Sequence, residues 1–363
     1  MSQNQNYIQL MNQSIGRLFK DALTISCKED LSQAFFLLQT IFRQRKAAIL
    51  RHKWQKKGIG VPPFMILSIT HQCNLRCKGC YAQAHHHSSD TELSTGRLRE
   101  IIAEARSLGI GISLLAGGEP LIRPEILEIA AGFPEIIFPV FSNGLLINDK
   151  LIGFFKKHKN IVPVISIEGD AEDTDGRRGA GVSQKLNQIL PLLQDNHIFY
   201  GVSLTVTRMN FKTITGEPFV KDLHQHGCRL FFYVEYVPVK ETTADWVLSE
   251  QQRKELLQAT QRMRLQFPSL FIAFPGDEEQ FGGCLAAGRG FIHISPDGNL
   301  EPCPFSPYSD TNLNKVSLKD ALKSRLLETI RNSHDRLKET TGGCALWENR
   351  EWVNSLLKET QNE

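Results

Sequence analysis

The sequence predicts an α/β protein whose main part is a partial (β/α)6 barrel of the TIM type, with a helical segment before it and a small α+β domain after it. Three observations lead to this fold class. Short apolar runs alternate with amphipathic segments from residue 64 to residue 237. Glycine and proline separate them. Their spacing is typical of crossover units that join parallel strands.

Six apolar runs define the expected strands of the barrel, at residues 64–70, 110–116, 136–141, 161–167, 198–206 and 229–237. Helices are expected between them, at residues 95–108, 124–132, 149–158, 183–195 and 217–226. The first of these helices has clear limits, because Ser94 is a suitable N-cap and Gly109 a suitable C-terminal glycine.

The pattern changes on both sides of the barrel. Residues 7–57 read as two helices, and glycines and prolines at 58–63 mark a boundary. After Pro238 we expect a long helix at 249–267, a strand at 270–274, a hairpin at 291–301 and helices near 317–331 and 346–358. We therefore divide the chain into residues 1–60, 61–240 and 241–363.

The charge is concentrated near the N-terminus. The chain has 363 residues and a formal net charge of +3, but residues 1–60 carry ten Lys/Arg and three acidic residues. A basic amphipathic helix can be a solvated face of a core-packing helix, which we favour, or a contact with an anionic membrane surface. We expect no nucleic-acid partner. Residues 1–13 lack a signal-peptide pattern, and no apolar run could span a membrane, so we expect a cytoplasmic protein that can contact the membrane peripherally.

The clearest chemical motif is a loop with three cysteines, Cys73, Cys77 and Cys80, directly after the first predicted strand. Three thiolates on a short loop can hold three irons of a cubane iron–sulfur cluster and leave a fourth iron open. The alternative is a zinc site, for which the histidines at 85–87 offer a fourth ligand.

The C-x3-C-x2-C spacing resembles the signature of the radical S-adenosylmethionine (SAM) superfamily, and a second landmark follows in order. Gly117, Gly118, Glu119 and Pro120 end the next predicted strand and resemble the motif that binds the amino group of SAM in that family. The resemblance implies a [4Fe-4S] cluster and SAM as cofactors, and an electron donor such as flavodoxin or ferredoxin.

Further residues at the carboxyl ends of the strands are expected to contact SAM by the same resemblance. They are Ser142 and Asn143 after the third strand, Ser166 and Glu168 on the ribose side, Arg178 or its neighbour Arg177 at the SAM carboxylate, and Thr205 and Tyr236 beside the adenine. One position departs from the family pattern. Many members have an aromatic residue before the third cysteine, where this chain has Gly79 and places Tyr81 after the cysteine.

A second set of cysteines, Cys284, Cys303 and Cys344, lies in the C-terminal region. Their context resembles the auxiliary-cluster domains named SPASM and, when shortened, twitch. Three cysteines instead of seven imply one auxiliary cluster, with a fourth site that is open or filled by a residue such as His293 or Asp277. The alternative is three buried structural cysteines. Cys27 and Cys228 fit neither set, and we expect both in the core.

These resemblances imply an enzyme that cleaves SAM reductively to a 5′-deoxyadenosyl radical and removes a hydrogen atom from a substrate. We expect a peptide or protein substrate, because auxiliary-cluster domains often accompany peptide maturation. Two alternatives stay open. One is a radical SAM enzyme acting on a small-molecule or lipid precursor, and the other is a non-catalytic iron–sulfur electron-transfer protein.

Overall fold

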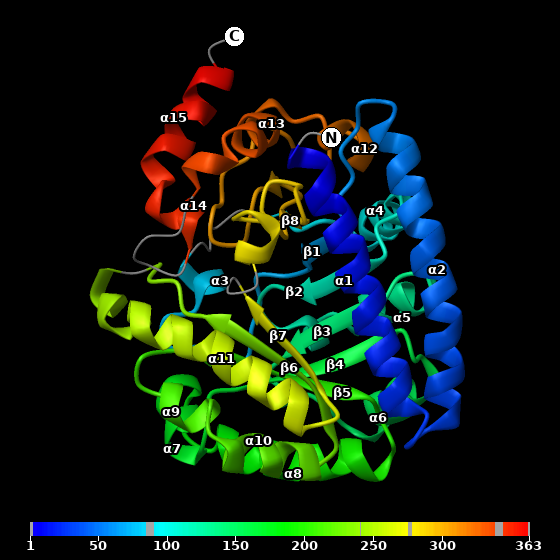
Figure 1. Cartoon of the computed structure of the whole chain (residues 1–363), viewed down its shortest axis with the longest axis vertical. Helices are drawn as coiled ribbons and strands as arrows, with labels where there is room; N and C mark the ends of the chain where they lie inside the picture. Colours follow the sequence, from blue (N-terminus) through cyan, green and yellow to red (C-terminus); the bar gives the residue numbers. More distant parts are fainter. Residues whose placement is uncertain (1–2, 85–90, 240, 275–277, 338–343, 362–363) are drawn as a thin grey trace.

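A single sheet organises the molecule (Figure 1). The computed structural model describes residues 3–84, 91–239, 241–274, 278–337 and 344–361. Within them the sheet has nine strands in the order β7-β6-β5-β4-β3-β2-β1-β8-β9. The strands are β1 (Phe64–Ser68), β2 (Ile112–Ala116), β3 (Phe138–Ser142), β4 (Ile161–Ile167), β5 (Tyr200–Val206), β6 (Cys228–Glu235), β7 (Leu270–Phe274), β8 (Phe291–Ile294) and β9 (Leu300–Glu301).

Strands β1 to β6 pair in sequence order and are all parallel, which confirms the predicted partial barrel. The connecting helices are α3 (Tyr81–Ala84), α4 (Thr95–Leu108), α5 (Pro124–Ala131), α6 (Asp149–Lys157), α7 (Ala171–Arg178), α8 (Val182–Asp195), α9 (Phe211–Ile214) and α10 (Glu217–Gln225), with the 3-10 turn η1 (Pro120–Ile122). Helix α4 has the expected limits: Ser94 accepts from Arg97 N, and Gly109 has a φ of 94°. The sequence reading missed α7, although Asp170 caps it.

The C-terminal region extends the sheet at both ends. Strand β7 pairs in parallel with β6, and β8 pairs in parallel with β1, while the predicted hairpin joins β8 to β9. The rings of Phe274 on β7 and Phe291 on β8 lie 5.3 Å apart, so the two ends of the sheet approach each other. Strands β7, β8 and β9 therefore continue the barrel wall.

The remaining helices of the C-terminal region surround this extension. They are η2 (Glu241–Trp246), α11 (Glu250–Gln266), η3 (Glu278–Phe281), α12 (Leu318–Ala321), α13 (Arg325–Asn332), η4 (His334–Arg336), α14 (Ala345–Glu348) and α15 (Arg350–Gln361). The single helix expected near 317–331 is divided into α12 and α13, because Ser324 begins a new helix by capping Leu327 N.

Two long N-terminal helices, α1 (Gln3–Ser26) and α2 (Leu31–Gln55), pack on the barrel. Helix α1 contacts α2 and β7, and α2 packs on α4 (Figure 1). Two buried side chains of α2 fix this arrangement: Arg51 donates to Gly109 O at 2.6 Å, and Gln44 donates to Gly111 O at 2.8 Å. Burial lowers the pKa of Arg51 to about 10.

The two cysteines outside the predicted sets differ in environment. Cys228 is buried at the start of β6, as expected, but Cys27 is exposed after the end of α1, so the expectation for Cys27 was wrong. Its position explains the difference, because the chain turns there between two helices. In the described part of the chain, no helix combines the length and the hydropathy needed to cross a bilayer.

Candidate functional site

The three-cysteine loop lies at the carboxyl end of β1. Cys73, Cys77 and Cys80 are all free and partly exposed, and all three line one large cavity inside the barrel. The start of the loop is fixed by Glu92, which accepts from Thr70 Oγ1 at 2.9 Å and from His71 N at 2.7 Å. The loop therefore presents three thiols at the end of a parallel barrel where sites are usually built.

Gly117 and Gly118 pack directly against the backbone of this loop. Gly118 N donates to Thr70 O at 2.7 Å, and Glu119 N donates to Gln72 O at 2.8 Å. Gly117 has a φ of 122°, and a Cβ there would lie 2.6 Å from Thr70 O, while a Cβ on Gly118 would clash with Gln72 O. The glycines thus allow the segment after β2 to cross the cysteine loop, in addition to bordering the cavity.

The Glu119 carboxylate is buried and holds the start of the next loop. Oε1 accepts from Ser142 Oγ at 2.8 Å and from Leu121 N at 3.0 Å, and Oε2 accepts from Asn143 N at 2.8 Å. Burial is the main effect that raises the pKa of Glu119, and these donors oppose it. Ser142 therefore acts by positioning Glu119, whereas Asn143 also lines the cavity.

A second buried carboxylate, Glu168, holds two arginines at the cavity. Its Oε1 lies 2.5 Å from Arg177 Nη1 and 2.8 Å from Arg178 Nε. Burial lowers the pKa of Arg177, but Glu168 and the thiols of Cys77 and Cys80 reverse that effect and raise it overall. Both arginines line the cavity, and Arg177 O also accepts from Lys78 N at 2.9 Å, so α7 supports the cysteine loop.

Asn210 is a supporting residue that the sequence reading missed. It is buried, and its Nδ2 donates to Glu168 O at 2.6 Å and to Thr205 O at 2.9 Å. Its Oδ1 accepts from Thr207 N at 2.8 Å. Asn210 therefore joins the ends of β4 and β5. The only signal in the sequence was a polar residue shortly after an apolar strand.

Tyr236 explains the glycine before the third cysteine. Gly79 has a φ of 65°, and a Cβ there would clash with the hydroxyl of Tyr236. That hydroxyl donates to Thr243 Oγ1 at 2.7 Å, and the ring packs on Trp246. An aromatic ring from the end of β6 thus occupies the space beside residue 79.

The thiols differ in their electrostatic surroundings. Burial raises the pKa of Cys73 most, and the negative charge of Glu119 adds to the increase. Burial also raises the pKa of Cys77, but Arg178 and Arg177 oppose it. Since a metal deprotonates the thiols that bind it, the arginines favour the thiolate form at Cys77.

Most of the predicted SAM-site residues meet at this cavity. Those that line it are Cys73, Cys77, Cys80, Gly117, Gly118, Glu119, Asn143, Ser166, Arg178, Thr205 and Tyr236. Three of the predicted residues do not line the cavity, namely Pro120, Ser142 and Glu168. Ser142 and Glu168 instead contact residues that do. The histidines at 85–87, considered as zinc ligands, lie outside the described residues.

The second cysteine set converges on a small cavity of about 20 Å³. Cys284, Cys303 and Cys344 are buried and line it together with Glu235 and Glu278. Burial, as the main cause, raises the pKa values of Cys284 and Cys303 well above the usual range. Three cysteines and two residues with carboxylate side chains therefore border the same small cavity.

The two residues considered as a fourth ligand are not seen at this cavity. His293 is buried elsewhere, with Nε2 2.8 Å from Ser68 Oγ and Nδ1 2.7 Å from Glu301 Oε2, and Asp277 lies outside the described residues. In the part of the chain that the structure describes, no three His, Cys, Asp or Glu side chains are arranged around a single metal ion. A cluster differs from a single ion because it distributes its ligands over several irons.

The fold and the site together define a partial parallel barrel with a cysteine-bearing loop at its carboxyl end. Residues 67–225 match the family model described as the radical SAM superfamily, so this part of the chain is a radical SAM domain. The protein is therefore an enzyme whose cofactors are a [4Fe-4S] cluster and SAM.

Curated relatives agree with this family, and a solved structure agrees with the fold. The chain is 26% identical over 316 residues to the AdoMet-dependent heme synthase of Methanosarcina barkeri, covering 79% of this chain and 88% of that protein. It is 26% identical over 284 residues to the subtilosin biosynthesis protein AlbA of Bacillus subtilis, covering 74% and 61%. The structure of Streptococcus suis SuiB bound to precursor peptide SuiA superposes with a TM-score of 0.63 at 18% identity, covering 86% and 75%.

The residues at the large cavity suit these cofactors. Three cysteines supply thiolates for iron, and carboxylate, amide, hydroxyl and guanidinium groups surround the same space. Arg177, which lines the cavity, has a buried Nε without a hydrogen-bond partner among the described residues. Such an atom is typical of a site whose ligand supplies the missing partner.

Proposed function

We propose that Cys73, Cys77 and Cys80 hold the cluster at which SAM is reductively cleaved, and that the protein uses the resulting 5′-deoxyadenosyl radical to remove a hydrogen atom from a substrate inside the barrel. One observation carries this proposal: the three thiols, Glu119 and Arg178 line the same cavity. When bound, the cluster and SAM supply the radical chemistry, and the barrel orients them and excludes water.

The surrounding residues have separate roles in this proposal. Glu119 and Asn143 line the cavity and would bind the amino group of SAM, and Arg178, which also lines it, would bind the carboxylate. Ser166 and Thr205 border the nucleoside, and Tyr236 covers the adenine. Ser142, Glu168 and Asn210 position these groups from behind.

Product analysis tests the proposed chemistry. Reconstituted protein with SAM and a strong reductant should form 5′-deoxyadenosine, and Cys77→Ala should form none. Equal amounts of 5′-deoxyadenosine from the two proteins, or none from either, would contradict the enzymatic function. The non-catalytic electron-transfer protein would then be the remaining hypothesis. Reduced flavodoxin or ferredoxin should replace the chemical reductant if either is the natural electron donor.

We also propose that Cys284, Cys303 and Cys344 bind one auxiliary cluster, with Glu278 or Glu235 beside its remaining iron. The convergence of three buried cysteines and two carboxylates on one cavity supports this site. A variant without Cys73, Cys77 and Cys80 should retain about four irons per chain. An iron-free variant would identify the second set as structural cysteines.

The substrate class has two candidates. A peptide or protein substrate is supported by the likeness to AlbA and to SuiB, whose structure holds a precursor peptide. A small-molecule or lipid precursor is supported by the likeness to heme synthase and by the mainly apolar lining of the cavity. Incubation with deuterated candidates distinguishes them, because only the true substrate transfers deuterium to 5′-deoxyadenosine.

The exposed face of α2 supports peripheral membrane contact, which we include in the proposal. Leu31, Phe35, Leu38, Phe42 and Ile49 are 44–78% exposed. At 3.6 residues per turn they fall on one side of the helix. Basic residues flank this side, and α2 has no acidic residue. An apolar stripe with basic flanks is complementary to an anionic bilayer surface.

A further inference from the structure

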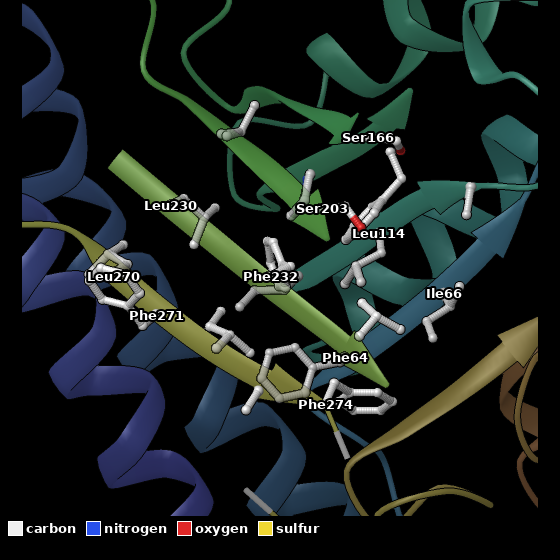
Figure 2. Close-up of a pocket in the computed structure, with 18 of the residues that line it drawn as sticks. Phe64, Ile66, Leu114, Ser166, Ser203, Leu230, Phe232, Leu270, Phe271 and Phe274 are labelled. Carbon is white, nitrogen blue, oxygen red and sulfur yellow. The ribbon is translucent and has the colours of Figure 1, made fainter. Parts of the chain in front are cut away.

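The interior of the barrel is hollow along its length. The cavity has a volume of about 870 Å³. Its wall is formed by alternate residues of the strands, such as Phe64 and Ile66 on β1 and Leu230 and Phe232 on β6 (Figure 2). In a complete TIM barrel, side chains usually fill this space in layers. Here Ser203, at the same level as Phe232, leaves the centre open.

The cavity extends from the cysteine loop to the opposite end of the strands. At one end it is lined by the cysteine loop and Tyr236, and at the other by Phe199 and Pro268, which precede β5 and β7. Along β6 and the two residues after it, the lining runs from Leu230 to Val237, which corresponds to about 23 Å of extended chain. Most of the wall between these ends is aliphatic or aromatic, with Ser166 and Ser203 as the polar residues labelled in Figure 2.

Helix α1 completes the wall where the sheet is open. Ile15, Leu18, Phe19, Ala22 and Ile25 from this helix line the same cavity as the strands. The apolar face of α1 therefore encloses ligand space and does not merely cover the outside of the barrel. A long and mainly apolar space favours an unbranched or isoprenoid chain over a peptide, whose backbone groups would lose hydrogen bonds there.

The same space adjoins the exposed apolar stripe on α2. Phe36 and Leu37 line the cavity, whereas their chain neighbours Phe35 and Leu38 are exposed. One turn of α2 thus faces the cavity on one side and solvent on the other. An aliphatic chain leaving a membrane surface would meet apolar side chains on both sides of this turn.

We infer that the barrel binds the aliphatic chain of a lipid, placed lengthwise so that one of its carbons lies beside the cysteine loop. This inference rests on the proposed function, and it names the substrate class for that site. The chain could come from a free fatty acid or from a membrane lipid, since both present the same apolar chemistry to the cavity.

Binding measured without turnover tests this inference. Equilibrium dialysis of the holoenzyme against radiolabelled palmitate or lysophosphatidylglycerol should show saturable binding at one site per chain. Preference for palmitate would identify a free acid, and preference for lysophosphatidylglycerol a membrane lipid. Ser203→Trp, which fills the centre of the cavity, should reduce the affinity about tenfold or more. The same substitution at exposed Ser355 on α15 should have no effect.

A second variant covers the case in which Ser203→Trp does not fold. Phe232→Ala enlarges the cavity and should shift the preference toward longer chains. No saturable binding of either probe, or equal binding by the Ser203→Trp and Ser355→Trp proteins, would overturn the inference. These results are independent of SAM cleavage, so a protein that forms 5′-deoxyadenosine but binds no chain would retain the proposed chemistry and lose only the lipid substrate.

Discussion

The ring of Tyr236 lies against Gly79, so closely that a Cβ on residue 79 would be 3.0 Å from two of its ring carbons. The two residues come from the end of β6 and from the position before the third cysteine of the loop. An aromatic ring supplied from across the barrel thus stands where the family pattern places one within the loop. This contact makes the conformation of the cysteine loop dependent on the end of β6.

Gly79→Ala should therefore impair the cluster site. The added methyl group meets the Tyr236 ring, and the φ of 65° is unfavourable for alanine by about 1–3 kcal/mol. We expect less iron per chain after reconstitution and slower 5′-deoxyadenosine formation. Gly153→Ala on α6 is the matched control, since no atom lies within 4 Å of its Cβ position. Full iron content in Gly79→Ala would show that the contact is unimportant.

Glu119→Gln tests the buried carboxylate between the second and third strands. All its neighbours are donors, and a glutamine amide would direct an NH2 group at one of them, at a cost of about 1–3 kcal/mol. We expect weaker SAM binding and a lower unfolding temperature. Glu125→Gln makes the same chemical change at a half-exposed site and should unfold like the wild type. Equal unfolding temperatures for both variants would contradict the role of Glu119.

Asp30→Asn should reveal a pH-dependent link between α2 and the barrel. Asp30 caps α2 through Ser32 N and lies 2.9 Å from Lys159 Nζ. Burial raises the pKa of Asp30, but the contact with Lys159 and the backbone donors outweigh it and lower the pKa below 3.8. The carboxylate therefore stabilises the fold above pH 3.8, and this contribution is lost as the pH falls through the lowered pKa.

Asparagine retains the cap but loses the ion pair, so the variant should be less stable than the wild type by at most about 1 kcal/mol near neutral pH. The difference should disappear in acid. Urea unfolding of both proteins as a function of pH measures it. A difference in the free energy of unfolding that does not shrink as the pH falls below 3.8 would instead be caused by packing.

The exposed face of α2 predicts binding to anionic vesicles. Replacing Phe35 and Phe42 by serine should reduce flotation of the full chain with phosphatidylglycerol vesicles about tenfold or more, because each exposed ring contributes apolar area. High salt should weaken binding by the wild type. Leu265→Ser on α11 removes a residue that is 90% exposed on another helix and should float normally. Absence of flotation by the wild type would reject the membrane contact.

Local patterns in the sequence were enough to predict the barrel. Apolar runs and caps such as Ser94 and Gly109 depend on neighbouring residues, so strands β1 to β6 were found within two residues at most of their ends. The pairing of β8 with β1 was not found, because it joins distant segments and leaves no periodic signal. Helix α7 was missed since it is short and mostly polar.

In the candidate site, too, features that depend on neighbouring residues were predicted, and contacts between distant segments were not. Spacing identified Cys73, Cys77 and Cys80, because the cysteines lie on one loop. The hydrogen bonds that Ser142 and Asn143 donate to Glu119 could not be predicted from the sequence, because they depend on how two loops cross. The sequence predicted helices at residues 7–57, but only the fold shows that the apolar face of α1 encloses a cavity.

The pairing of β8 with β1 also has a consequence for synthesis on the ribosome. Strand β1 is made early, yet its neighbour on one side, residues 291–294, is among the last parts of the barrel to be made. Until then β1 has an unpaired edge, directly before the cysteine loop, of the kind that favours aggregation. The nascent chain must therefore keep this edge protected, and the loop reaches its final surroundings only when translation is nearly finished.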